Sequence, residues 1–201
     1  MRDPAIHQAH VADARRIGRI TSEAFFDDPV NLWIMRKPSL IKAFMTGLAK
    51  NIYLPRGFSE YLDEGAGATM WLPPGANGDL SLGNTLALGA SAVLHGVPSA
   101  LARGMAFGAC VQKVHPKEPH FYLFTIGIVP RAQGKGLGGA LLRSGLARVD
   151  QAGMPAYLES TKASNIPIYE RYGFELRDVP TLPEGCPPIY PMWRPAQPAT
   201  V

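Results

Sequence analysis

Cysteine is scarce in this sequence, and so are the features that mark secreted or metal-binding proteins. The 201 residues include two cysteines, Cys110 and Cys186, with no C-x-x-C pair and no histidine at metal-ligand spacing. Lone thiols of this kind are typical of a reducing compartment. The first residues also lack the apolar core of a signal peptide. We therefore expect a cytoplasmic protein that binds no metal.

Long apolar runs and basic runs are missing as well. Residues 80–111 are rich in Leu, Ala and Gly, but they contain Asn84 and His95 and are interrupted by Pro98. A membrane span needs about 20 apolar residues, so we predict two packed helices that break near residues 96–98, and no membrane contact. The formal net charge of +4 comes without any Lys/Arg-rich stretch, which argues against nucleic-acid binding. The positive balance could still attract an anionic ligand.

The most informative stretch is a strand, a glycine-rich loop and a helix. Residues 121–129 form an apolar, β-branched and aromatic run that is typical of a buried strand. Pro130 ends this run, and the loop that follows reaches Gly139. A helical pattern then continues to Gly153. Because glycines let the main chain turn sharply, and the first helical turn offers unpaired N–H groups, we expect a phosphate-like anion to bind here.

Two common phosphate loops fit this glycine pattern poorly. A nucleotide-triphosphate loop requires Ser or Thr after its Gly-Lys pair, whereas Gly134-Lys135 is followed by Gly136. Gly134, Gly136 and Gly139 do match the dinucleotide pattern, and Glu159 lies at a suitable distance along the chain. However, several residues separate the strand from the first glycine. The chain after Glu159 is also too short for the remaining strands of a doubly wound sheet.

The loop and a second motif downstream resemble the N-acetyltransferase (GNAT) superfamily. The resemblance covers residues 119–180 well and the rest of the chain loosely. It implies a mixed α+β fold with a central, mostly antiparallel sheet flanked by helices, in which a splayed pair of strands holds acetyl-CoA. The two motifs that carry it are Gln133-x-x-Gly136-x-Gly138 and Asn165…Tyr169-Glu-x-x-Gly-Phe174.

The resemblance also implies a site for acetyl-CoA. In the family, the loop binds the pyrophosphate, and the preceding strand pairs with the pantetheine arm through its main chain. A main-chain N–H of that strand, here Ile128 or its neighbour, stabilises the oxyanion. The residues that this implies for acetyl-CoA binding are Ile126, Ile128, Val129, Gln133, Gly134, Lys135, Gly136, Leu137, Gly138, Gly139 and Asn165.

The resemblance implies a catalytic acid but leaves the base open. Tyr169 matches the tyrosine that protonates the departing thiolate, unless it is a core residue of its helix. Tyr172 is the expected packing residue. The strand before the loop contains no glutamate, so Glu159 is the best remaining carboxylate for a base. Glu159 could instead be a structural hydrogen-bonding group, and deprotonation through water would need no base. Asn165 is also expected to cap its helix.

The acceptor side is defined less sharply by the sequence. Residues 25–29 end a helix, and residues 30–35 are predicted as an apolar turn that packs on the core. Alternatively, this aromatic and acidic stretch lines an amine pocket in which Asp27 or Asp28 attracts the cation.

Two histidines and a tryptophan are weaker candidates for the site. Trp71 is expected in the core, with its indole at most bordering the pocket. His115 and His120 lie in a proline-rich turn and are expected to be surface or capping groups. His120 is a weak candidate for the base.

The remaining patterns predict the order of the other elements. One acetyltransferase domain is expected over residues 1–194, with a flexible tail at 195–201 and a helical insertion at 80–114 that lies over the acceptor side. The last strand contains prolines, which favours a place near the sheet edge. The other predicted segments are a strand at 5–9, helices at 13–26 and 39–53, a hairpin of 58–62 and 68–72, a strand at 156–159, a helix at 165–173, and strands at 174–179 and 189–194.

Together these patterns predict an acetyl-CoA-dependent N-acetyltransferase. The acceptor would be a primary amine, on a small molecule or on a peptide or protein, which attacks the thioester directly within a ternary complex. The alternative is a non-catalytic acyl-CoA sensor or scaffold that uses the same loop. A homodimer is possible on either interpretation, and the acceptor itself is left open.

Overall fold

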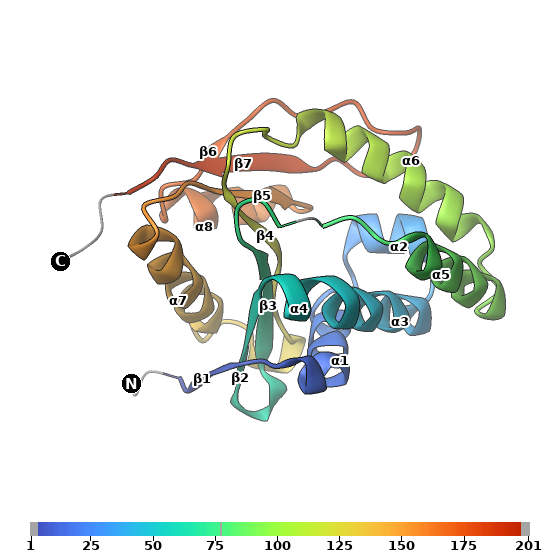
Figure 1. Cartoon of the computed structure of the whole chain (residues 1–201), viewed down its shortest axis with the longest axis horizontal. Coiled ribbons are helices and arrows are strands. Elements are labelled where there is room, and N and C mark those ends of the chain that lie inside the picture. Colours follow the sequence, from blue (N-terminus) through green and yellow to red (C-terminus); the bar gives the residue numbers. More distant parts are fainter. Residues whose placement is uncertain (1–3, 77, 198–201) are drawn as a thin grey trace.

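A seven-stranded sheet forms the centre of the computed structural model, which describes residues 4–76 and 78–197 (Figure 1). The strands lie in the order β1-β2-β3-β4-β5-β7-β6, and each neighbouring pair is antiparallel except β4 and β5. The predicted mixed, mostly antiparallel sheet is therefore confirmed. The strands are β1 (Ile6–Gln8), β2 (Phe58–Leu62), β3 (Gly67–Leu72), β4 (Phe121–Ile128), β5 (Ala156–Ser160), β6 (Glu175–Leu176) and β7 (Tyr190–Arg194).

Helices cover both faces of the sheet (Figure 1). Side chains alternate across a strand, so β3 sends Met70 into the core beneath α1 and α3, and Trp71 into the core beneath α7. Trp71 is fully buried, as predicted. The helices are α1 (Ala14–Ala24), α2 (Pro29–Met35), α3 (Pro38–Leu48), which continues through a π-helical turn (Ala49–Tyr53) into α4 (Leu54–Arg56), α5 (Leu82–Leu94), α6 (Ser99–Val114), α7 (Leu137–Gln151) and α8 (Ile166–Glu170).

The helical stretch before β4 has the predicted form of two helices. A turn separates α5 from α6, and it contains Gly96 at a φ of 68°. The turn is held by Lys37, whose Nζ donates to the main-chain oxygen of His95 at 2.7 Å. No helix in the described ranges is long and apolar enough to span a membrane.

Residues 30–35 form part of a helix, so the prediction of an apolar turn was wrong. Asp28 is the N-cap of α2, and its carboxylate accepts a hydrogen bond from the main-chain N–H of Asn31 at 2.8 Å. Pro29 occupies the first helical position, where its missing N–H is not needed. The Asp-Pro pair therefore starts a new helix after the end of α1.

The last strand lies second from the edge of the sheet, in agreement with the prediction of a place near the edge. β7 pairs with β5 along its length and with the two-residue β6 on its other side. The carbonyl of Pro191 accepts a hydrogen bond from the N–H of Arg177, on the β6 side. In an antiparallel strand the N–H and C=O of one residue point the same way. The missing N–H of Pro191 thus removes no bond to β5. The strand predicted at 174–179 is limited to β6.

A buried arginine connects β7 to α7 and to the turn after α8. Arg194 donates from Nη1 and Nη2 to the two carboxylate oxygens of Asp150, at 2.5 and 3.0 Å, and from Nε to the carbonyl of Tyr172 at 2.7 Å. Arg194→Met should lower the free energy of unfolding by about 2 kcal/mol, because it leaves Asp150 and that carbonyl without their donor. Urea denaturation would measure this. Arg171→Met, at an exposed position, is the control, and equal losses in both variants would contradict the prediction.

Candidate active site

Strands β4 and β5 pair for a short distance and then separate. Their register covers Phe121–Leu123 and Ala156–Leu158. The N–H of Val129 donates to Ala66, on the β3 side. Because hydrogen-bonding direction alternates along an antiparallel strand, the main-chain groups of Ile128 and Ile126 point the other way, into the gap. The side-chain amide of Gln133 already donates to the carbonyl of Ile128 at 3.0 Å, from the gap side.

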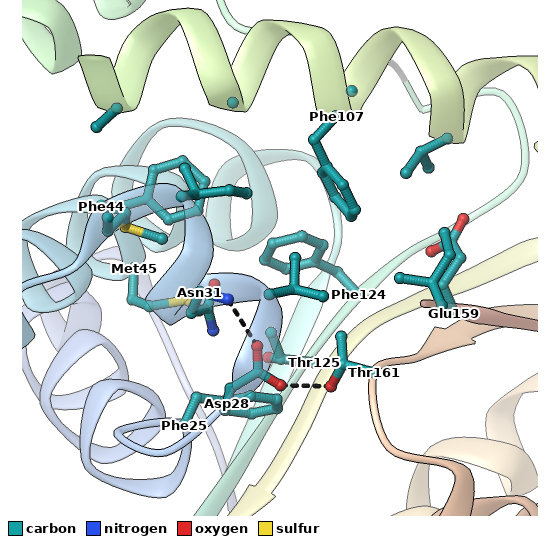
Figure 2. A pocket seen from close by; sticks show the side chains of 18 of the residues that line it. Phe25, Asp28, Asn31, Phe44, Met45, Phe107, Phe124, Thr125, Glu159 and Thr161 are labelled. Carbon is teal, nitrogen blue, oxygen red and sulfur yellow. Dashed lines mark hydrogen bonds between the residues drawn. The ribbon is translucent and has the colours of Figure 1, made fainter. Parts of the chain in front are cut away.

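A β-bulge in β4 changes which side chains face this gap. Met70 pairs with Thr125 and Trp71 with Leu123, so Phe124 is an extra residue on β4. A bulge re-aims the side chains around it. As a result Phe124 and Thr125, neighbours in sequence, both line the same cavity (Figure 2). No glycine or proline marks the bulge in the sequence, and neither residue was predicted as part of the site.

The glycine loop lies at the end of β4 and opens directly into α7. Gly134 and Gly136 have φ values of 76° and 74°, in the left-handed region that favours glycine. A Cβ atom added to either glycine would meet nothing within 4 Å, so the loop presents an open surface. Lys135 is exposed between them. The first turn of α7 directs its N–H groups at this surface, as the sequence motif implied.

A cavity of about 480 Å³ lies where β4 and β5 part, between the sheet and helices α2, α3, α5 and α6 (Figure 2). Both β4 and β5 contribute to its floor, through Thr125, Ile126, Glu159 and Ser160. The α8 segment contributes Asn165 and Tyr169. The fold thus brings residues from the β4–loop–α7 unit and from the second motif to one space.

Asp28 lines this cavity but is already engaged in structural contacts. Besides capping α2, its carboxylate accepts a short hydrogen bond from the hydroxyl of Thr161 (Figure 2). Burial raises the pKa of Asp28, and these two hydrogen bonds oppose the rise. Asp27, the other rim candidate, is exposed and forms an ion pair with Lys162 at 3.0 Å. Of the two acids, Asp28 is therefore the one at the cavity.

Glu159 lies at the centre of a buried polar cluster on the cavity wall. Its Oε2 accepts a hydrogen bond from the hydroxyl of Tyr122 at 2.7 Å. Its Oε1 lies 3.5 Å from Nδ1 of His115 and has no hydrogen-bond partner among the described residues. The side chain is 9% exposed. The carboxylate is thus held in place by one oxygen, while the other is left available.

Of the two histidines before β4, His115 is partly exposed and is the C-cap residue of α6, whereas the prediction of a surface or capping group was wrong for His120. His120 is buried, and its Nε2 lies 3.2 Å from Nε2 of His115. Both rings pack edge-on against Tyr157 of β5. Burial is the main cause that lowers the pKa of His120. The start of β4 lies beside β5, and this tertiary pairing, which no local pattern reveals, buries His120.

The tyrosine of the second motif lines the cavity from α8. Burial raises the pKa of Tyr169 to about 12, so its phenol is protonated at physiological pH. Its ring packs on Phe174 with centroids 5.9 Å apart. Tyr172 accepts a hydrogen bond from Arg143 at 3.1 Å and packs against the α7 core. Asn165 occupies the N-cap position of α8, but its side chain makes no capping hydrogen bond, which corrects that expectation.

Comparisons with known proteins agree with this arrangement. The acetyltransferase (GNAT) family matches residues 91–174. An uncharacterized N-acetyltransferase of Schizosaccharomyces pombe is 27% identical over 184 residues, which cover 85% of this chain and 74% of the relative. Mycothiol acetyltransferase of Saccharomonospora viridis is 36% identical over 84 residues, which are 37% of this chain and 28% of that protein. The match thus spans only about a quarter of the mycothiol enzyme.

The fold has a counterpart among solved structures. A structure of histone acetyltransferase HPA2 and related acetyltransferase from Corynebacterium glutamicum superposes with a TM-score of 0.71 over the full length of both chains, at 24% identity. That likeness concerns the fold. The sequence matches, which include both motifs at the parted strands, make the chain similar to the GNAT family of acetyltransferases over residues 91–174.

Proposed function

We propose that this protein transfers the acetyl group of acetyl-CoA to a primary amine by direct attack in a ternary complex. The proposal rests on how close the parts of the site lie to one another. The anion-binding loop and the unpaired main chain of β4 border the gap between β4 and β5. The cavity at the same gap is lined by the carboxylate of Glu159, one oxygen of which has no hydrogen-bond partner among the described residues, and by the protonated phenol of Tyr169.

The residues present fit acetyl-CoA. The pyrophosphate would lie on the open surface of Gly134 and Gly136, against the N–H groups at the start of α7. Lys135 adds a cation at that surface. The main-chain groups of Ile126 and Ile128 face the gap, where an amide-containing arm can pair with them as a strand would. The thioester is then directed towards the cavity.

Glu159 is proposed as the base that accepts a proton from the ammonium of the acceptor. The free Oε1 can accept that proton, while Tyr122 holds Oε2. The neutral amine then forms the C–N bond at the thioester carbonyl, and its second proton passes through solvent to restore the phenol of Tyr169 after that residue has acted as the acid. A main-chain N–H of β4, at Ile128 or its neighbour, stabilises the negative oxygen.

Tyr169 is proposed as the acid. When the C–S bond breaks, the sulfur leaves with the electron pair and takes the phenolic proton of Tyr169. The products are the amide and the free thiol of CoA, and one proton is released to solvent overall. Helices α5 and α6, within the 80–114 segment, would form the outer wall of the acceptor site in a domain of residues 1–194.

Tyr169→Phe should reduce kcat by roughly 100-fold or more, because the thiolate must leave without an acid. The affinity for acetyl-CoA should stay within about twofold, since the ring is retained. Calorimetric titration with acetyl-CoA measures the affinity, and thiol release with an amine acceptor measures turnover. Tyr172→Phe is the matched control, and it should keep near-normal turnover because Tyr172 packs against α7. A Tyr169→Phe variant with unchanged kcat would remove Tyr169 from the acid role.

A further inference from the structure

The cavity is apolar over most of its wall. The helices on the outer side contribute aliphatic and aromatic side chains, and Phe124 of the bulge faces them (Figure 2). Asp28 and Glu159 are the only charged residues among those that line the cavity in the described part of the chain. The main apolar contacts that a ligand would meet are Ile34, Phe44, Met45, Leu88, Phe107 and Phe124.

The helical wall is anchored, so this space is preformed. Arg103 of α6 donates from Nε and Nη2 to the carbonyl of Ile34 at the end of α2, at 3.1 and 2.6 Å. Lys37 holds the α5–α6 turn from the other side. A preformed apolar space favours ligands that fill it, because little ordering entropy is lost on binding.

The cavity wall carries two buried acceptor atoms that lack a hydrogen-bond partner among the described residues. Thr125 is 4% exposed, and its Oγ1 has no hydrogen-bond partner among the described residues. The same is true of Oε1 of Glu159. A buried polar atom without a partner is destabilising, because it has lost its hydrogen bonds to water. An ammonium group has three donors and no acceptor, so it can satisfy an acceptor atom of this kind.

We infer that the acceptor is a primary amine carried on a compact apolar body, aromatic or branched aliphatic. This inference rests on the proposed function and concerns the same site. The ammonium lies at Glu159, and the apolar body extends between α3 and α6. A polyamine would place its second ammonium among apolar side chains, where desolvation is unfavourable. A peptide would place unpaired main-chain groups there.

Gly108 offers a way to alter this space. It lines the cavity from α6, and a Cβ atom added to it would meet nothing within 4 Å. Gly108→Leu would therefore add a branched aliphatic side chain at the cavity wall without a clash in the helix. Its matched control is Gly83→Leu, the same change in α5 at an exposed position that does not line the cavity.

The test uses thiol release from acetyl-CoA with four amines: 2-phenylethylamine, methylamine, 1,4-diaminobutane and a lysine-containing peptide. For the native protein, kcat/KM with 2-phenylethylamine should exceed that with 1,4-diaminobutane by about 100-fold. Gly108→Leu should reduce the preference for 2-phenylethylamine over methylamine at least tenfold. Gly83→Leu should leave that preference unchanged.

The outcomes separate the acceptor class from the reaction. If acetyl-CoA binds and the diamine or the peptide is the better acceptor, the inference is overturned and the acetyltransferase proposal stands. Equal loss of preference in Gly108→Leu and Gly83→Leu also overturns the inference. If acetyl-CoA does not bind in calorimetry, or binds and no amine gives thiol, the proposed function fails and the inference fails with it.

Discussion

Gly136→Glu should weaken the binding of acetyl-CoA by at least roughly 100-fold, which corresponds to about 2.7 kcal/mol. The substitution places a carboxylate on the surface where the pyrophosphate would lie, so two like charges compete for the start of α7. It also forces a side chain into a backbone conformation at a φ of 74°. Calorimetric titration with acetyl-CoA gives the affinity directly.

Gly153→Glu separates these two effects. Gly153 has a φ of 60°, and a Cβ atom there would also meet nothing within 4 Å, so the backbone strain is similar. However, it follows the far end of α7, about 22 Å away for a helix of this length. This variant should lose stability but keep its affinity. If both variants bind acetyl-CoA equally well, the phosphate site is not at this loop.

Glu159→Gln should lower kcat by roughly 100-fold or more at neutral pH. The amide retains the size of the side chain and can still contact Tyr122, but it cannot accept a proton from the ammonium. Only the unprotonated fraction of the acceptor then reacts. For an amine with a pKa near 10, that fraction rises about tenfold per pH unit below the pKa. The ratio of the native kcat to the kcat of Glu159→Gln should therefore fall between pH 7 and pH 9.

The control for this charge change is Glu60→Gln. Glu60 is 3% exposed, accepts a hydrogen bond from Ser144 at 2.9 Å and lies under α7, away from the cavity. The Glu60→Gln variant should retain turnover. Parallel pH profiles for Glu159→Gln and the native protein, separated by a constant factor, would mean that Glu159 positions other groups and is not the base.

The strand, loop and helix around residues 121–153 could be predicted because their signals are local. An apolar strand, a proline and closely spaced glycines define this unit without reference to the rest of the chain. The hairpin of β2 and β3 and the pair α5 and α6 were predictable for the same reason. The prediction of a turn at residues 30–35 was wrong although the local signal was present, because Asp28 before Pro29 is typical of the start of a helix.

Other features depend on strand pairing and have no local signal. The bulge at Phe124 arises from the register between β3 and β4. The burial of His120 requires β5 beside the start of β4, and the pairing of β7 on both sides requires a short β6 beyond it. For the same reason Thr125, an unremarkable residue in a strand, could not be recognised as a cavity residue from the sequence.

Beyond Leu123 and Leu158, the parting of β4 and β5 leaves one side of each strand unpaired in the middle of the sheet. A ligand that pairs with Ile126 and Ile128 would complete the sheet, and its binding free energy would then add to the free energy of folding. At 100 times its dissociation constant this contribution is about 2.7 kcal/mol. The half-life of the protein in a cell would therefore follow the local supply of acetyl-CoA, so that the cosubstrate regulates how much enzyme is present as well as how fast it works.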